Sequence, residues 1–177
     1  MCKYAKYAFL TRLCMGMMVL WFCACQPSPQ QVRHLSDDRE VDTSLIAQLQ
    51  WNMHMSALAD KQCADYVKQD TIQYVMDDFG FWYSHTLRNQ ADSLQHGQAV
   101  TLHMLLYLLT DTLIADMCEE ITIGTGELPM AVYRGLTFMR HGEQMHIVAP
   151  WNTAYGVEGT SLIPPYTNVK FIISTIE

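Results

Sequence analysis

The sequence predicts a domain of the α+β class, in which one long helical segment precedes a mainly β part. Apolar residues recur at helical spacing over residues 44–78, and neither Pro nor Gly interrupts this stretch. Two apolar runs flank a Thr-Asp-Thr turn at 110–112, as in a β-hairpin. Residues 142–171 predict a strand, a turn at Pro150, a short helical turn, a flap and a final strand.

Residues 1–24 have the features of an export signal and take no part in the fold. Three basic residues precede an apolar run of 12 residues, whereas a bilayer-spanning helix needs about 20. An ordinary signal peptide or a short uncleaved anchor remains an open alternative. The ending, with Ala24 before Cys25, resembles a bacterial lipobox. That resemblance implies a lipoprotein signal peptide, acylation of Cys25 and anchoring of the mature chain in a membrane.

Residues 25–42 have the composition of a tether, because they are polar, charged and punctuated by two prolines. We therefore expect a lipid-anchored protein of the bacterial cell envelope whose domain faces the periplasm. Gln26, rather than aspartate, follows the modified cysteine, which favours the outer membrane.

The charge balance excludes one class of partner. The signal segment holds three of the eleven Lys and Arg but none of the eighteen Asp and Glu, so the mature chain carries a formal charge of −10. Nucleic-acid binding requires basic patches that neutralise phosphate, and we expect no nucleic acid as a partner.

The cysteines and histidines predict no metal site. The seven His residues lack the spacing of zinc ligands, and we expect neither a metal nor an organic cofactor. If Cys25 is acylated, Cys63 and Cys118 remain. Two arrangements stay open: a disulfide, which an exported protein permits, or two buried free thiols, which we favour.

The helical segment covers residues 43–78, and Ser44 near its start is a candidate N-cap. It forms either one bent helix or two helices with a break near Asp60. Two roles are open for it: packing against the sheet of the following domain, or formation of a homodimer, as a helical extension does in some bacterial relatives of the family described below.

The β part begins with the aromatic run at 79–83. A strand is expected over 97–105, and its return strand over 113–116 after the Thr-Asp-Thr turn. The one internal helix is expected over 128–139, where a proline near the start is tolerated because the first helical amides lack partners.

Residues 135–177 resemble the C-terminal half of FKBP-type peptidyl-prolyl isomerases. The anchors are an Ala-Tyr-Gly motif, an Ile-Pro-Pro motif and spaced Gly, Met, Pro and aromatic residues; they fall on Gly135, Met139, Gly142, Pro150, Ala154, Tyr155, Gly156, Gly159, Ile163, Pro164, Pro165 and Phe171. The resemblance covers 79–177. It implies a curved antiparallel sheet of five or six strands wrapped on one short helix, preceded here by a helical segment. The pattern is also similar to lipoproteins of this family that are associated with gliding motility.

The same resemblance implies a site for prolyl isomerisation. Rotation about an amide has a barrier of about 18–20 kcal/mol, which a protein lowers by binding the twisted amide more tightly than the planar one. The resemblance assigns catalytic roles to Tyr155, whose hydroxyl donates to a carbonyl, to Phe171 on the pocket floor, and to Asp116. It assigns substrate binding to Met104, Leu128, Val132, Leu162 and Ile163.

Several pocket positions depart from the family pattern. Val132 stands in place of a tryptophan, Met104 in place of a tyrosine and Ala115 in place of a phenylalanine. Pro129 replaces a residue whose backbone N–H contacts the ligand. We expect a shallower pocket with fewer aromatics.

Two classes of function follow from the sequence. One is a membrane-anchored peptidyl-prolyl cis-trans isomerase, weak in activity, acting on proline-containing exported polypeptides. The other is a peptide-binding or chaperone module, or a subunit of an envelope complex, with a degenerate pocket.

Overall fold

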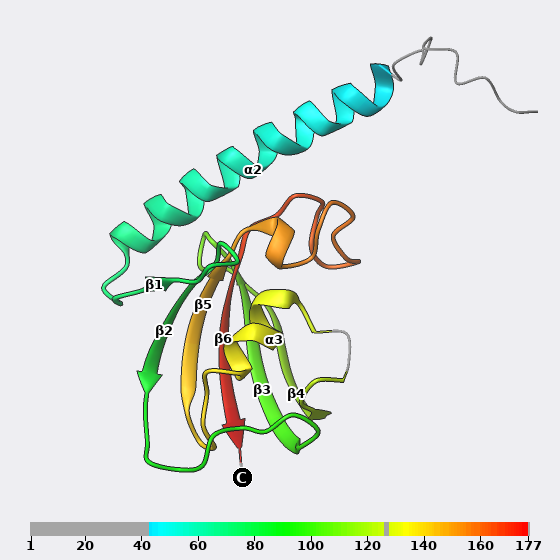
Figure 1. Ribbon diagram of the computed structural model, residues 1–177. Coiled ribbons are helices and arrows are strands. Elements are labelled where there is room, and N and C mark those ends of the chain that lie inside the picture. Colours follow the sequence, from blue (N-terminus) through cyan, green and yellow to red (C-terminus); the bar gives the residue numbers. More distant parts are fainter. Residues whose placement is uncertain (1–42, 126–127, 177) are drawn as a thin grey trace, which may run out of the picture. The chain divides into compact units, whose positions relative to one another are not determined.

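The computed structural model describes residues 43–125 and 128–176 (Figure 1). The expected signal peptide at 1–24, the tether at 25–42 and the lipidation site Cys25 lie outside the described residues. Thr43–Glu177 forms one compact unit.

A single helix, α2 (Thr43–Gln69), opens the described chain and runs through Asp60 without a break. The prediction that it continues to residue 78 is wrong. The Asp70 carboxylate accepts hydrogen bonds from the Ile72 backbone N–H (3.2 Å) and the Tyr74 hydroxyl (2.8 Å), and such side-chain bonds compete with helix formation. No helix within 43–125 or 128–176 has both the length and the hydropathy to cross a membrane.

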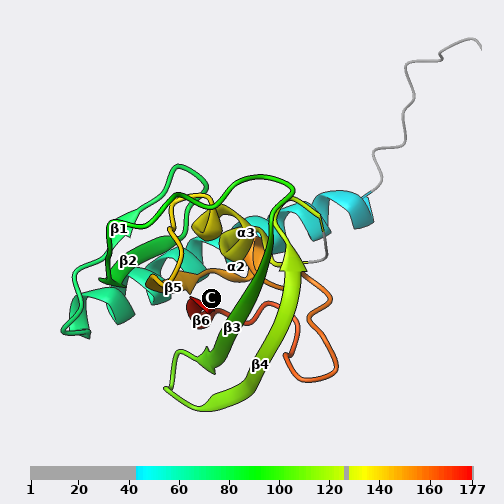
Figure 2. The ribbon, with the colours of Figure 1, turned by 90° about the horizontal axis from the view of Figure 1, so that it is seen from below.

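Six antiparallel strands form one curved sheet, which confirms the expected fold class (Figures 1 and 2). The strands are β1 (Val75–Met76), β2 (Trp82–Leu87), β3 (Ala99–Leu108), β4 (Leu113–Thr122), β5 (Gln144–Ala149) and β6 (Val169–Ile176). Their order across the sheet is β1-β2-β5-β6-β3-β4. The predicted hairpin is β3 and β4, and its return strand extends well beyond Asp116.

The internal helix α3 (Met130–Leu136) lies on the concave face of the sheet and is shorter than the predicted 128–139. Gly135 favours its close approach to β5, because a Cβ there would lie 2.6 Å from the Ile147 Cδ1 atom and would require that side chain to shift. The core lies between this helix and the sheet, and its strand residues alternate along β3 and β6, as a half-buried pleat requires.

Helix α2 packs on the domain through its buried Ala59 and Cys63. The Trp151 indole N–H donates to the Met55 carbonyl oxygen (3.3 Å), and the Tyr166 hydroxyl donates to the Asn52 side chain (2.7 Å). The structure therefore supports packing of the helical segment against the domain, through the segment between β5 and β6.

The two described cysteines are both free thiols, as we favoured. Cys63 is buried at the inner side of α2, and this burial raises the pKa of its thiol to about 12. Cys118 is exposed on β4, so the expectation that both thiols are buried is wrong for this residue.

Candidate functional site

Most of the predicted site residues lie together on the concave face, in what we call the concave cluster. Its buried members are Met104, Val132, Ile163 and Phe171, and its half-buried margin includes Ala115, Met117, Leu128 and Tyr155. These side chains come from β3, α3, the flap and β6, and from the β4 strand beside them. The fold thus brings together residues that are up to 67 positions apart in the chain.

Tyr155 is positioned by the short helical turn at Trp151–Thr153. The Gly156 N–H closes this turn on the Trp151 carbonyl oxygen (2.7 Å), and Gly156 has the positive φ of 73° that favours glycine. The Tyr155 ring lies 6.0 Å from the Phe171 ring, centroid to centroid, at an interplanar angle of 48°.

The Tyr155 hydroxyl is available as a hydrogen-bond donor. It bonds no other described residue, and its oxygen is not among the buried polar atoms. Burial of the ring raises the pKa of Tyr155, so the hydroxyl keeps its proton at neutral pH.

The flap holds Ile163 in the cluster. The Ile163 N–H donates to the Thr160 hydroxyl oxygen (3.0 Å), and the Thr160 N–H donates to the Ile163 carbonyl oxygen (2.8 Å). Gly159 has a φ of 66°, and any side chain there would overlap the Ile163 and Pro164 carbonyls. Leu162 points away instead and is 62% exposed, so the structure does not place it in the cluster as expected.

Asp116 lies on the opposite face of the sheet, which corrects its expected position in the pocket. Met117 pairs with Met104 and shares its concave face. Because successive residues of a strand point to opposite faces, Asp116 points to the convex face. There its carboxylate lies 2.7 Å from the His103 Nε2 atom.

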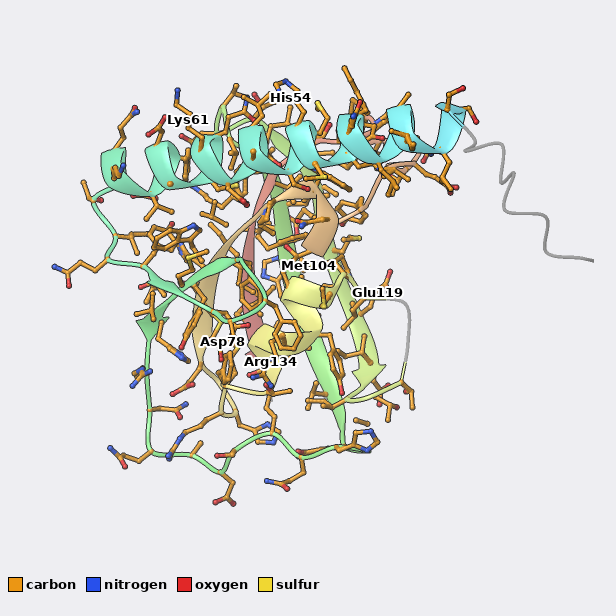
Figure 3. All side chains as sticks on the ribbon, turned by 45° about the horizontal axis from the view of Figure 1, so that its top comes forward. His54, Lys61, Asp78, Met104, Glu119 and Arg134 are labelled. Carbon is orange, nitrogen blue, oxygen red and sulfur yellow. The ribbon has the colours of Figure 1, made fainter. Side chains whose placement is uncertain are left out.

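The cavity beside the concave cluster is small, about 30 Å³. Its lining comes from β3, β4 and the residue before Pro129: Leu102, Met104, Met117, Glu119, Ile121 and Leu128. Figure 3 labels Met104 on β3 and Glu119 on β4. This volume holds about two water molecules. Phe171, Val132 and Ile163 are fully buried, so a ligand reaches them only if the margin at Leu128 or the flap moves.

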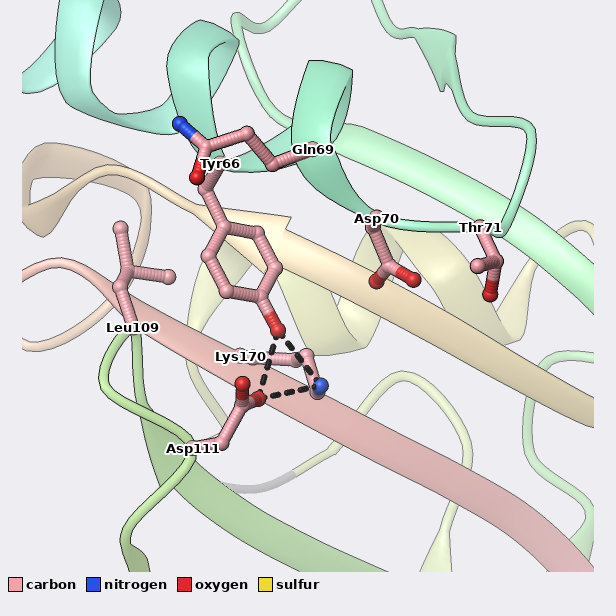
Figure 4. A pocket seen from close by; sticks show the side chains of 7 residues that line it. All are labelled: Tyr66, Gln69, Asp70, Thr71, Leu109, Asp111 and Lys170. Atoms are coloured by element: carbon pink, nitrogen blue, oxygen red, sulfur yellow. Dashed lines mark hydrogen bonds and ion pairs between the residues drawn. The ribbon is translucent and has the colours of Figure 1, made fainter.

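A polar site, separate from the apolar concave cluster, lies between α2 and the β3–β4 turn (Figure 4). The Lys170 ammonium lies 2.8 Å from the Asp111 carboxylate and 2.6 Å from the Tyr66 hydroxyl, which itself donates to Asp111 (2.7 Å). Hydrogen bonding to Lys170 lowers the pKa of Asp111. A cavity of about 410 Å³ is lined in part by Tyr66, Asp111 and Lys170. Local sequence signals could not find it, because Tyr66 and Lys170 are 104 residues apart.

Another polar site surrounds the buried Glu143 carboxylate, which accepts hydrogen bonds from the backbone N–H groups of Asn89 (3.2 Å) and Arg140 (2.9 Å). His85 Nδ1 lies 3.6 Å from this carboxylate and has no hydrogen-bond partner. Burial, and then the charge of Arg88, lower the pKa of His85, against the opposing effect of Glu143. The sequence analysis did not predict that His85 and Glu143 lie together.

Comparison with solved structures supports the fold. A peptidyl-prolyl cis-trans isomerase from Pseudomonas syringae pv. tomato is 16% identical with a TM-score of 0.59, over 71% of this chain and 93% of that one. FkpA from Escherichia coli is 14% identical with a TM-score of 0.60, over 94% of this chain and 80% of that one. The N-terminal domain of FKBP42 from Arabidopsis thaliana is 17% identical with a TM-score of 0.54, over 61% and 93% of the two chains.

A search of curated proteins finds no match. Residues 90–176 match the family model of the FKBP-type peptidyl-prolyl cis-trans isomerase. This range holds β3 to β6, helix α3, the flap and the concave cluster. The family match and the shared fold agree with the Ala-Tyr-Gly and Ile-Pro-Pro motifs, and through this domain the chain belongs to the FKBP-type peptidyl-prolyl cis-trans isomerase family.

Proposed function

We propose that the protein is a weak peptidyl-prolyl cis-trans isomerase that acts on exported polypeptides at the concave cluster. One observation carries the proposal: the Tyr155 hydroxyl is a free donor at the margin of an apolar cluster whose floor is Phe171. An apolar surface with one donor is what the twisted amide requires, since its carbonyl needs an orienting hydrogen bond and its ring needs an environment poor in water.

The reaction needs no proton transfer and no covalent intermediate. The X-Pro amide binds against Met117, Leu128 and Tyr155, the half-buried members at the margin of the cluster. The Tyr155 hydroxyl donates to a substrate carbonyl and fixes its orientation. The surrounding apolar side chains favour the less polar twisted amide over the planar one, which lowers the barrier to rotation.

Two features support low activity. The cavity of about 30 Å³ leaves too little room for a prolyl ring without movement of the margin. Pro129 precedes the first residue of α3 and has no N–H, so the helix start lacks one donor toward a bound peptide.

The test is refolding of an unfolded substrate protein that is limited by a slow X-Pro step, with the full chain as catalyst. Tyr155→Phe removes the proposed donor, and Tyr133→Phe is the matched control because Tyr133 is exposed on α3 outside the cluster. We expect catalysis by the wild type and by Tyr133→Phe, and a reduced rate with Tyr155→Phe. Equal rates in all three proteins would remove Tyr155 from the mechanism.

The second candidate is a peptide-binding or chaperone module without useful catalysis. The small cavity and the buried Phe171 favour it, because a closed cluster can support recognition at its rim without enclosing a proline. Suppression of aggregation of an unfolded substrate, together with no acceleration of the X-Pro step, is the result that selects this function.

Membrane attachment through Cys25 belongs to the same proposal and has its own test. The full chain produced in a bacterium that processes lipoproteins should partition into the detergent phase, and Cys25→Ser should move it to the aqueous phase. If both proteins partition alike, Cys25 is not the anchor.

A homodimer through α2 is also proposed. Apolar residues on the first half of this helix remain exposed: Leu45, Ile46, Leu49, Trp51 and Met53. A self-complementary contact would cover them. Light scattering should give twice the chain mass for the wild type and a monomer for Leu49→Glu; a monomeric wild type would contradict the proposal.

A further inference from the structure

The two edges of the sheet differ greatly in length. The β1 edge is two residues long, and short edge strands limit unwanted pairing. The other edge is β4, which is ten residues long and pairs only with β3 among the strands of the described chain (Figure 2). A long open edge presents a row of backbone donors and acceptors to which another strand can bind.

The register shows which β4 residues present these groups. The Ile123 N–H donates to the Gln98 carbonyl oxygen (2.8 Å), and its carbonyl oxygen accepts from the Gly97 N–H (2.7 Å), so Ile123 directs both groups toward β3. In an antiparallel pair this direction alternates along the strand. Thr122, Glu120, Cys118 and Asp116 therefore direct their backbone N–H and C=O groups to the open side.

The side chains of this edge are acidic on both faces of the sheet. Asp116 and Glu120 lie on the convex side, and Glu119 lies on the concave side with Met117. His103 contacts Asp116, whereas Glu119 and Glu120 have no ion pair with any residue in 43–125 or 128–176. Pairing of two β4 edges from two copies would bring these carboxylates together, which disfavours self-association.

An incoming strand would also lie beside apolar side chains. Met117 and Ile121 lie on the concave side of β4 and line the cavity of about 30 Å³ with Leu128. Alternate residues of an added strand would extend over these groups, while the residues between them would lie beside Cys118 and Glu120. The edge is thus suited to a segment in which apolar and basic residues alternate.

We propose that β4 is a docking edge for an extended basic segment of a partner polypeptide, which binds by strand addition. The open backbone groups of residues 116–122 supply the main-chain hydrogen bonds, and Asp116, Glu119 and Glu120 select basic side chains. This binding needs neither Tyr155 nor a proline in the ligand, so a peptide without proline tests it separately from isomerisation, although both ligands would contact Met117 and Leu128.

The probe is a fluorescent ten-residue peptide of alternating Lys and Val, without proline, titrated against the full chain and followed by anisotropy. A peptide of alternating Glu and Val is the control for charge. We expect saturable binding of the basic peptide only, weakened by salt.

Two variants separate the backbone contribution from the charge. Cys118→Pro removes one open N–H while leaving the β3–β4 hydrogen bonds intact, as proline at a strand edge does. Glu120→Lys reverses one charge and leaves the backbone alone; Asp60→Lys on the exposed side of α2 is its matched control. We expect affinity to fall on the order of tenfold for Glu120→Lys and to stay unchanged for Asp60→Lys.

Hydrogen exchange in the wild type provides a test that needs no variant. Peptide binding should slow exchange of the Cys118 and Glu120 amides, which point to the open side, and leave the Met117 and Glu119 amides, already bonded to β3, unchanged. Failure of the basic peptide to bind would overturn the proposal. So would binding that protects no β4 amide, because the peptide would then lie elsewhere.

Discussion

Replacement of Tyr155 by Phe is the sharpest test of the proposed site, because it removes one oxygen atom and little else. The Tyr155 hydroxyl bonds no described residue, and the ring keeps its contact with Phe171, 6.0 Å away between centroids. No hydrogen bond among residues 43–125 and 128–176 is lost, so we expect the free energy of unfolding to change by less than about 0.5 kcal/mol.

The expected kinetic effect is larger. A hydrogen bond between neutral groups contributes about 0.5–1.5 kcal/mol net, which corresponds to a fall in kcat/KM of about 2- to 13-fold. The assay is catalysed refolding across a slow X-Pro step, measured beside urea unfolding of the same samples. An unchanged kcat/KM in a stable variant would falsify the assignment of Tyr155 as the donor. A loss of stability of about 2 kcal/mol would show that the hydroxyl has a structural partner.

Three further predictions concern stability and thiol chemistry. Burial lowers the pKa values of His85 and His146 below the unfolded value of 6.5. Below about pH 6.5 the unfolded chain therefore binds more protons than the folded chain, and the free energy of unfolding should fall as the pH drops. The fall is at most about 1.4 kcal/mol per pH unit for each residue. Urea midpoints between pH 7.5 and 5 should show this loss, with a smaller slope for His146→Gln; a flat profile contradicts it. Ala59→Arg places an unpaired charge under α2 and should lower stability by about 2 kcal/mol or more in urea unfolding, whereas Ala57→Arg on the exposed side of the same helix should not. Alkylation at pH 8, mapped by mass spectrometry, should modify Cys118 and spare Cys63, whose thiol has a pKa of about 12; equal labelling would show that α2 leaves the domain.

Sequence reasoning identified the elements whose signals are local. The Thr-Asp-Thr turn at 110–112 predicted the β3–β4 hairpin, and Asp111 adopts there the positive φ of 59° that Asp tolerates better than most residues. Pro150 predicted the end of β5, and the Ala-Tyr-Gly motif predicted the turn that holds Tyr155. In each case a few adjacent residues determine the backbone.

Predictions failed where the neighbours are distant in sequence. The spacing of Val67, Thr71 and Val75 indicated helix, but the Asp70 side chain bonds the backbone at Ile72, and Val75 pairs with Tyr83 in the sheet. Asp116 was assigned from its place in a motif, whereas the face that it occupies depends on the register between β3 and β4. A shift of one residue would have placed it in the pocket.

The closed cluster explains why weak activity is expected even though the donor is present. A valine in place of a large aromatic should leave space at position 132, yet Val132 is fully buried. The neighbouring side chains of the core therefore cover the position that the smaller residue occupies. A prolyl ring can enter only when Leu128 or the flap at Ile163 moves, and the affinity for substrate is reduced by the fraction of molecules in the open state. Substitutions at Leu128 that favour the open state of the cluster should therefore raise kcat/KM. Added aromatic groups on the floor of the cluster should raise it less, because no ligand reaches that floor while the cluster is closed.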